Sequence, residues 1–149
     1  MMRTMLRIVT AAACVLAWHG AVRTGVVTAA GAQAATQITA ADAAPFLGEW
    51  TLTLQGPNGP GTFTLSVNVE KEKVVADITS EAMPKQAITS ISLANKSLVL
   101  GYTFTWEGNP VEAVVTLTPD TEGKTAAQID FAGGAYVMQG TAMKKEKGK

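Results

Sequence analysis

The sequence has almost none of the side chains on which nucleophilic and metal-dependent catalysis relies. It contains one cysteine, Cys14, and one histidine, His19, and its last arginine is Arg23. All three lie within residues 1–34, a segment with the features of a cleaved export signal. The rest of the chain has no thiolate, imidazole or disulfide, which excludes Ser-His and Cys-His catalysis and structural zinc. We expect a protein that is not an enzyme and that holds neither a metal nor a cofactor.

The scarcity of positive charge also limits the partners. Without arginine, the remaining chain lacks the planar group that binds phosphate or guanine, and its lysines form no stripe with aromatic residues, so we expect no nucleic-acid binding. The stretch GPNGPG at residues 56–61 is no phosphate loop, because its prolines lack N–H donors. Paired carboxylates could hydrolyse glycosides, although solvated surface carboxylates are far commoner. The carboxylates considered are Asp77, Glu81, Glu107, Glu112 and Asp130.

Residues 1–34 predict export. Arg3 and Arg7 give a positively charged start, and residues 8–18 form an uncharged, mostly apolar run. The small residues that follow include AQA at residues 32–34, which suits cleavage after Ala34. We therefore expect a periplasmic or secreted protein. Cleavage leaves nine lysines and twelve acidic residues, a net charge of about −3.

Two other interpretations of this segment remain. A transmembrane anchor needs roughly 20 apolar residues, and residues 8–18 are fewer. A lipoprotein would be acylated at Cys14, but three alanines precede that residue and an apolar stretch follows it. We expect no transmembrane anchor in the exported protein.

After Pro45, apolar residues alternate with polar ones in nearly every segment, and turn residues separate the segments. This pattern is typical of an antiparallel all-β domain. Because short connections join neighbouring antiparallel strands, we expect an up-and-down meander. The eight predicted strands cover residues 49–55, 62–70, 73–79, 86–93, 97–106, 110–118, 124–132 and 135–143.

The register of the predicted hairpins follows from their apolar faces, since a slip of one residue would turn every side chain to the other face. Five hairpins need loops with an even number of residues. The turn TPDTEGK needs an odd number, and TSEAMPKQ is the least regular connection. The predicted pairs are Gly56 with Gly61, Leu54 with Phe63, Leu52 with Leu65, Trp50 with Val67, Val69 with Val74, Leu93 with Leu98, Ile91 with Leu100, Phe104 with Val111, and Phe131 with Tyr136.

One face of each predicted strand is apolar, and the other is rich in hydroxyl side chains. A single sheet without covering helices has to bury its apolar face against itself, and eight strands can do so by closing into a barrel. A two-sheet sandwich is the alternative, but it usually needs longer crossover connections. We predict an all-β, eight-stranded antiparallel up-and-down barrel over residues 46–143.

The first predicted strand opens with FLGEW, residues 46–50. This motif resembles the F-x-G-x-W of the lipocalin and fatty-acid-binding-protein group of barrels, and the chain also resembles small exported bacterial barrel domains with a G-x-W-x-L motif. The resemblance implies a lipocalin-like, calycin-type barrel whose floor is closed by Trp50. The chain has no arginine to stack on Trp50 from the last strand, and Lys144 or Lys145 is the candidate to replace it. The helices that cover or follow such barrels have no counterpart here.

Short segments flank the predicted barrel. Residues 35–45 are expected to form a linker or one short helical turn, with Thr39 as its N-cap and Asp42 three residues later. Residues 144–149, KKEKGK, are expected to form a solvated basic tail.

The meander sorts the turns into two ends of different chemistry. Trp50 shares one end with the turns richest in charge, and most aromatic residues gather at the other. These large side chains either fill the barrel or form an apolar mouth for a small hydrophobic ligand, with Tyr102 and Tyr136 orienting it. The candidate ligand-binding residues are Phe63, Met83, Tyr102, Phe104, Trp106, Phe131 and Tyr136.

The expected function is therefore that of an exported, non-catalytic barrel that binds a small hydrophobic molecule or acts as an interaction module with a protein partner. The alternative is a periplasmic barrel similar to protease inhibitors, which would insert residues 35–45 into an enzyme. Inhibitors of that kind are also small exported barrels, but they carry a disulfide, which this chain lacks.

Overall fold

The structure, a computed structural model, describes residues 38–146. The predicted export signal, its cleavage site and the last three residues of the tail lie outside the described part. The described residues form an all-β domain with three short helical segments. These segments are α1 (Ala40–Ala43), η1 (Ala44–Phe46) and η2 (Ala132–Gly134). The strands are β1 (Gly48–Gly56), β2 (Gly59–Glu70), β3 (Lys73–Ser80), β4 (Met83–Ala87), β5 (Ser90–Ala94), β6 (Ser97–Trp106), β7 (Asn109–Pro119), β8 (Thr125–Phe131) and β9 (Tyr136–Lys144).

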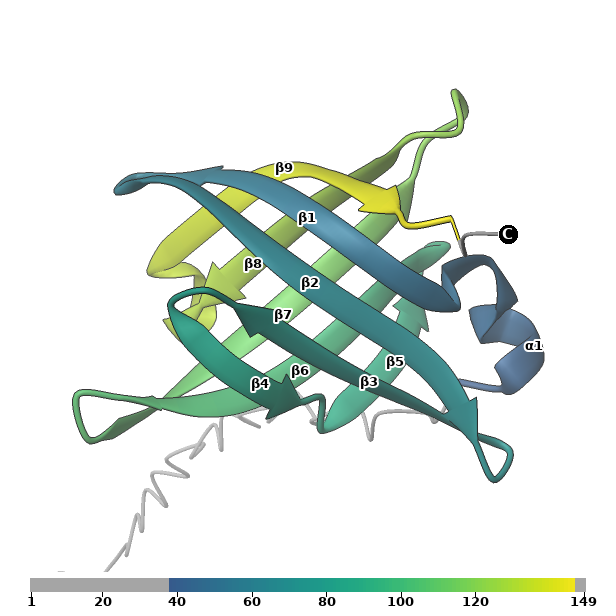
Figure 1. Ribbon diagram of the computed structural model, residues 1–149, viewed down its shortest axis with the longest axis horizontal. Helices are drawn as coiled ribbons and strands as arrows, with labels where there is room; N and C mark the ends of the chain where they lie inside the picture. The colour runs from purple at the N-terminus through teal and green to yellow at the C-terminus, as the bar shows by residue number, and fades with distance from the viewer. Residues whose placement is uncertain (1–37, 147–149) are drawn as a thin grey trace, which may run out of the picture. The chain divides into compact units, whose positions relative to one another are not determined.

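The strands form one antiparallel sheet (Figure 1), in the order β4-β3-β2-β1-β9-β8-β7-β6-β5. Apart from β4 and β5, strands that follow one another in the chain are neighbours in the sheet. The first and last strands also pair, from Trp50 opposite Lys144 to Gln55 opposite Gln139. The predicted antiparallel up-and-down arrangement is confirmed.

The prediction of eight strands closed into a barrel is wrong, because the sheet has nine strands and two edges. The predicted strand at residues 86–93 is divided into β4, which pairs with β3, and β5, which pairs with β6. These two half-strands do not pair with each other and form the edges of the sheet. The hydrogen-bonded ladder therefore stays open between β4 and β5.

The division occurs where the chain changes its neighbour. Ile88 N–H donates to Ala76 O on β3 at 2.9 Å, and the next residue, Thr89, donates its N–H to Gly101 O on β6 at 2.8 Å. On the β3 side the register also shifts between Ile78 and Ser80, as a β-bulge does. The connection TSEAMPKQ is thus irregular, as the sequence predicted.

The register agrees with the prediction in four hairpins. Their confirmed pairs are Val69 with Val74, Leu93 with Leu98 and Ile91 with Leu100, Phe104 with Val111, and Phe131 with Tyr136. The loop between β7 and β8 is odd-numbered, as predicted, because Pro119 pairs with Thr125 across five residues.

The predicted register of the first hairpin is wrong by two residues. Gly56 pairs with Gly59 instead of Gly61, so the turn consists of two residues, Pro57 and Asn58, instead of four. As a result Leu54 faces Gly61, Leu52 faces Phe63 and Trp50 faces Leu65. Because the error is an even number, the same side chains still point to the same face.

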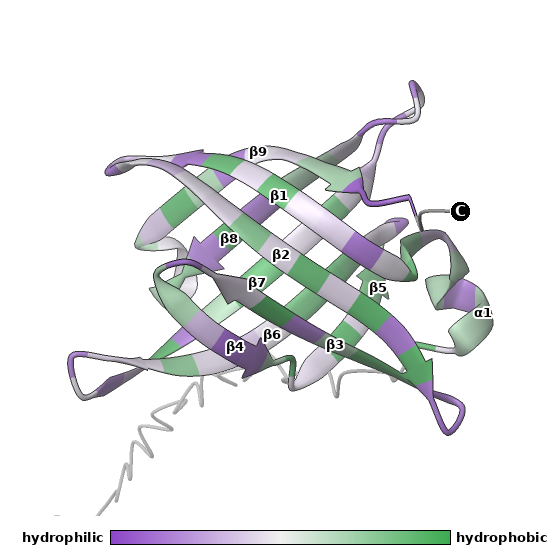
Figure 2. Ribbon diagram, in the orientation of Figure 1, coloured by the Kyte–Doolittle hydropathy of each residue, from purple (hydrophilic) through white to green (hydrophobic). Residues whose placement is uncertain are grey.

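The apolar face of the sheet is buried against itself. In Figure 1, β1, β2 and β3 cross in front of β6, β7 and β8, and the side chains between them form one core cluster. The alternation that produces this face is visible along β2 in Figure 2. The largest fully buried side chains are Leu52, Leu54, Leu65, Val67, Ile78, Leu98, Leu100, Val115, Leu117 and Ile129.

The segment before β1 is packed on this core. Thr39 is the N-cap of α1 and accepts a hydrogen bond from the N–H of Asp42, as expected from the sequence. Ala43 and Phe46 are buried, and Phe46 belongs to the core cluster. Within residues 38–146, none of the helices has the length and apolar character needed to cross a membrane.

Candidate functional site

The turns separate into two ends, as the meander predicts (Figure 1). The turns after β1, β3, β6 and β8 lie at one end, and those after β2, β5 and β7 lie at the other with α1 and the end of β9. The second end has the higher density of charge, because its turns carry EKEK and TPDTEGK. The aromatic residues predicted for the first end define the candidate site.

Four of the seven predicted site residues form a continuous row of rings, which we call the aromatic cluster. Phe104 lies 5.9 Å from Tyr102 and 5.9 Å from Phe131, between ring centroids, and Phe131 lies 5.7 Å from Tyr136. The Phe104–Phe131 contact is edge-to-face, a favoured arrangement of aromatic rings. The sheet register produces this row, because Ala113 on β7 lies between Tyr102 and Phe131 on the neighbouring strands.

Two glycines of the first hairpin leave space for neighbouring side chains at the same end of the sheet. A Cβ at Gly56 would lie 2.8 Å from the Tyr136 hydroxyl and 2.9 Å from Met138 Cγ. At Gly61, a Cβ would lie 2.9 Å from Met138 Cε and 3.2 Å from Phe63 Cε2. Phe63 is therefore brought beside Met138, a buried residue that the sequence analysis did not include. Met138 could have been included from the sequence, because it lies on the apolar face of the last predicted strand.

The two remaining predicted residues lie apart from the ring row. Met83 starts β4 and is half-buried against the core. Trp106 ends β6 at the hairpin turn and is 59% exposed. Trp106 is therefore a surface residue near the cluster and not part of its packing.

Tyr102 is the one residue of the cluster that is almost completely buried, with 2% of its surface exposed. Its hydroxyl has no hydrogen-bond partner among the described residues. Leaving a buried hydroxyl unpaired costs about 1–3 kcal/mol. Burial also raises the pKa of Tyr102 to about 12, because the phenolate would be poorly solvated there.

We expect Tyr102→Phe to remove a loss of stability at high pH. The pKa of Tyr102 is about 12 when folded against a usual value of 10.0, so between these values the unfolded state releases its proton first and stability falls as pH rises. One group shifted this far accounts for about 2–3 kcal/mol at pH 12. Denaturant unfolding of both proteins at pH 9 and near pH 11.5 measures the effect. An equal difference between the two proteins at both pH values would contradict the burial of Tyr102.

The opposite end is organised by the FLGEW motif. The Trp50 indole N–H donates to the Phe46 carbonyl at 2.7 Å, and Lys144 Nζ lies 5.6 Å from the centroid of the Trp50 ring. Of the two lysines considered for contact with Trp50, Lys144 is therefore the one that forms a cation–π contact with its ring. Gly48 has a φ of +121°, and a Cβ there would lie 3.0 Å from Lys144 Cε, so the motif needs glycine at this point.

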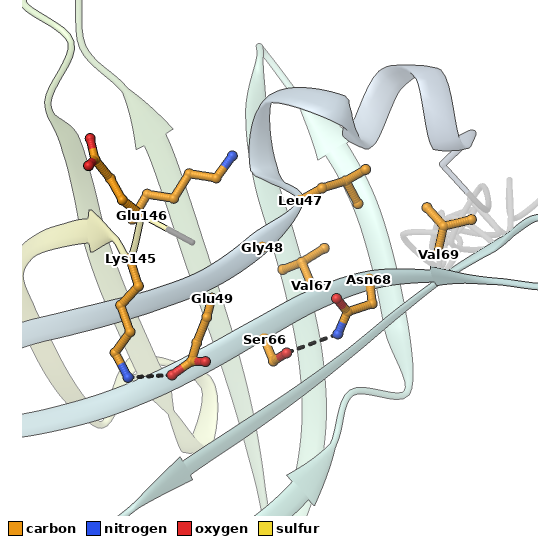
Figure 3. Close-up of a pocket in the computed structure, with 10 residues that line it drawn as sticks. Leu47, Gly48, Glu49, Ser66, Val67, Asn68, Val69, Lys145 and Glu146 are labelled. Carbon is orange, nitrogen blue, oxygen red and sulfur yellow. Dashed lines mark hydrogen bonds and ion pairs between the residues drawn. The ribbon is translucent and has the colours of Figure 1, made fainter. Parts of the chain in front are cut away.

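A groove of about 1280 Å³ lies beside this motif (Figure 3), and the sequence analysis did not anticipate it. Its apolar wall includes Leu47, Val67 and Val69. Its polar wall includes an ion pair between Glu49 and Lys145. The backbones of the same two residues are also joined, because Lys145 N–H donates to Glu49 O at 2.8 Å.

Metal binding and hydrolysis by paired carboxylates are the two chemistries considered for the acidic side chains of the described residues. Within residues 38–146 no group of three or more His, Cys, Asp or Glu side chains could hold a metal ion. Two of the carboxylates considered for glycoside hydrolysis lie on strands that are not neighbours, Asp77 on β3 and Asp130 on β8. Asp77 is paired with Lys85 at 3.1 Å, and Asp130 accepts hydrogen bonds from Gln128. Comparison of the chain with protein-family models, curated proteins and solved structures finds no match.

Proposed function

We propose that this chain is an exported, non-catalytic binding protein whose aromatic cluster receives a small apolar molecule. The observation that carries the proposal is the partial exposure of Phe104, Phe131 and Tyr136, three rings in contact at one end of the sheet. Rings that served only as core would gain more from complete burial, whereas half-buried rings offer an apolar surface to a ligand. The half-buried Tyr136 adds a polar group to this surface, and the Tyr102 hydroxyl is a second polar group that is buried within the row.

We also propose that the domain is related to the lipocalin-like barrels, with an opening between β4 and β5. It is supported by the contacts of the FLGEW motif, in which the Trp50 indole is bound to Phe46 and covered by Lys144. The burial of Trp50 on the first strand is consistent with the role that the resemblance implies.

The protease-inhibitor alternative has less support. An inhibitory segment at residues 35–45 has to leave the domain and enter an enzyme. Ala43, in the described part of that segment, is completely buried, and the residues after it lead directly into the core residue Phe46. A segment held in this way is part of the fold, so its removal would destabilise the domain.

The test is titration of the exported protein with N-phenyl-1-naphthylamine, an uncharged apolar fluorophore. We expect one binding site with energy transfer from Trp106, which lies near the cluster. Phe104→Ala should weaken binding by about fivefold or more, because it removes a ring from the row. Val69→Ala, at the other end of the sheet, is the matched control and should change the affinity less than twofold.

Two results would contradict the proposal. One is the absence of stoichiometric binding by the wild-type protein, with Phe104→Ala lowering stability alone, as a completely filled core requires. The other is binding that Val69→Ala weakens as much as Phe104→Ala, which would move the site to the groove beside Trp50.

A further inference from the structure

The unpaired Tyr102 hydroxyl identifies what kind of molecule would complete this site. Tyr102 lies two residues further along β6 from the hairpin turn than Phe104, so it is the deepest ring of the row. Its hydroxyl is buried and has no partner among the described residues. A ligand that enters past the half-buried Phe104 ring, with rotation of that ring, would meet this hydroxyl last.

The surroundings of Tyr102 carry no charge on the face of the sheet to which it belongs. Its cross-strand neighbour is Ala113, and the next residue along the row is Phe131. The nearby acidic residues belong to the other face, because Glu112 is paired with Thr103 and Asp130 with Val114. A ligand carboxylate at this depth would lose its hydration without gaining a cation, whereas a neutral acceptor loses little.

We propose that the aromatic cluster selects a neutral apolar molecule with one hydrogen-bond acceptor, a ketone, ester or amide carbonyl, to which the Tyr102 hydroxyl donates. This inference rests on the proposed function. The aromatic row binds the apolar body of the molecule, and the Tyr102 hydroxyl donates a hydrogen bond to the acceptor at the inner end of the molecule. Discrimination follows because a buried hydroxyl rejects an analogue that leaves it unpaired.

The experiment uses three naphthalene dyes that share a 6-dimethylamino group and differ at position 2. One carries a propionyl ketone, one a propyl chain and one a carboxylate. For the wild-type protein we expect affinity to fall in that order. Tyr102→Phe should weaken ketone binding by about fivefold to tenfold, the value of one hydrogen bond, and change propyl binding less than twofold. The unfolding midpoint of Tyr102→Phe at pH 7 verifies that the variant is folded.

The outcomes separate the two proposals. If the dyes bind but Tyr102→Phe leaves ketone affinity unchanged, the proposed hydrogen bond from Tyr102 is refuted, whereas the proposed apolar binding site is not. Tighter binding of the carboxylate than of the ketone would overturn the neutral-ligand inference in the same way. If none of the dyes binds the wild-type protein, the proposed function fails and this inference fails with it.

Discussion

Trp50→Ala is expected to lower the free energy of unfolding by about 3–5 kcal/mol, the usual cost of removing a large aromatic side chain from a core. Trp50 is 6% exposed and belongs to the core cluster. It lies on β1 between Leu65 of β2 and Lys144 of β9, so the cavity would open where three strands meet.

The substitution also removes two specific contacts. The Phe46 carbonyl would lose the hydrogen bond from the indole, and Lys144 would lose the ring beneath its ammonium group. The segment that contains α1 and η1 is attached to the core through Phe46, so we expect it to loosen first.

Denaturant unfolding followed by circular dichroism measures the change. Trp106→Ala is the matched control, since Trp106 is 59% exposed and its loss should cost no more than about 0.5 kcal/mol. Equal destabilisation by the two substitutions would show that Trp50 does not have the packing role that its burial assigns to it.

Much of the fold could be predicted from the sequence because alternation is a local property. Each strand shows its apolar face in its own residues, and apolar faces that must meet fix the parity of every hairpin. Pairs such as Phe104 with Val111 and Phe131 with Tyr136 follow from this rule together with the turn residues between the strands. Parity does not distinguish a two-residue loop from a four-residue loop, and so the first hairpin was predicted two residues out of register.

The division between β4 and β5 could not be predicted in this way. Residues 86–93 were predicted as one strand from their apolar pattern, but the two ends of this segment pair with different strands. Which neighbour a strand has depends on how the whole sheet bends, and the bulge near Ser80 is a tertiary feature.

The candidate site was predictable in its composition and not in its detail. The turn positions placed the aromatic residues at one end. The approach of Met138 to Gly61 and the missing partner of the Tyr102 hydroxyl depend on distances between strands that are far apart in the sequence. Gly140 is a third case of this kind, and it carries the last prediction.

Gly140 lies where the last strand joins the first. It is paired with Leu54 on β1 and with Ala127 on β8. A Cβ at this position would collide with the backbone carbonyl oxygen of Thr53 and would lie 3.0 Å from Leu54 Cα. A flexible side chain could turn away from such a contact, but a strand backbone moves only if its pairing is disturbed.

Gly140→Ala is therefore expected to cost about 3 kcal/mol or more, at the upper end of the range for overpacking. The damage should centre on the β1–β9 ladder, so that amide hydrogens of β1 and β9 exchange faster than those of β6 and β7. Hydrogen exchange and denaturant unfolding measure both effects.

Gly101→Ala is the matched control for this substitution. Gly101 is also partly exposed and lies inside a strand, and a Cβ there would meet Ser90 Oγ, a side-chain atom that can rotate away. We expect this control to be much less destabilising than Gly140→Ala. If the two variants are equally stable, the backbones of β1 and β9 lie further apart at Gly140 than they do in the structure. If Gly140→Ala alone is destabilised and exchange rises first in β1 and β9, the pairing of the two terminal strands holds the rolled sheet together.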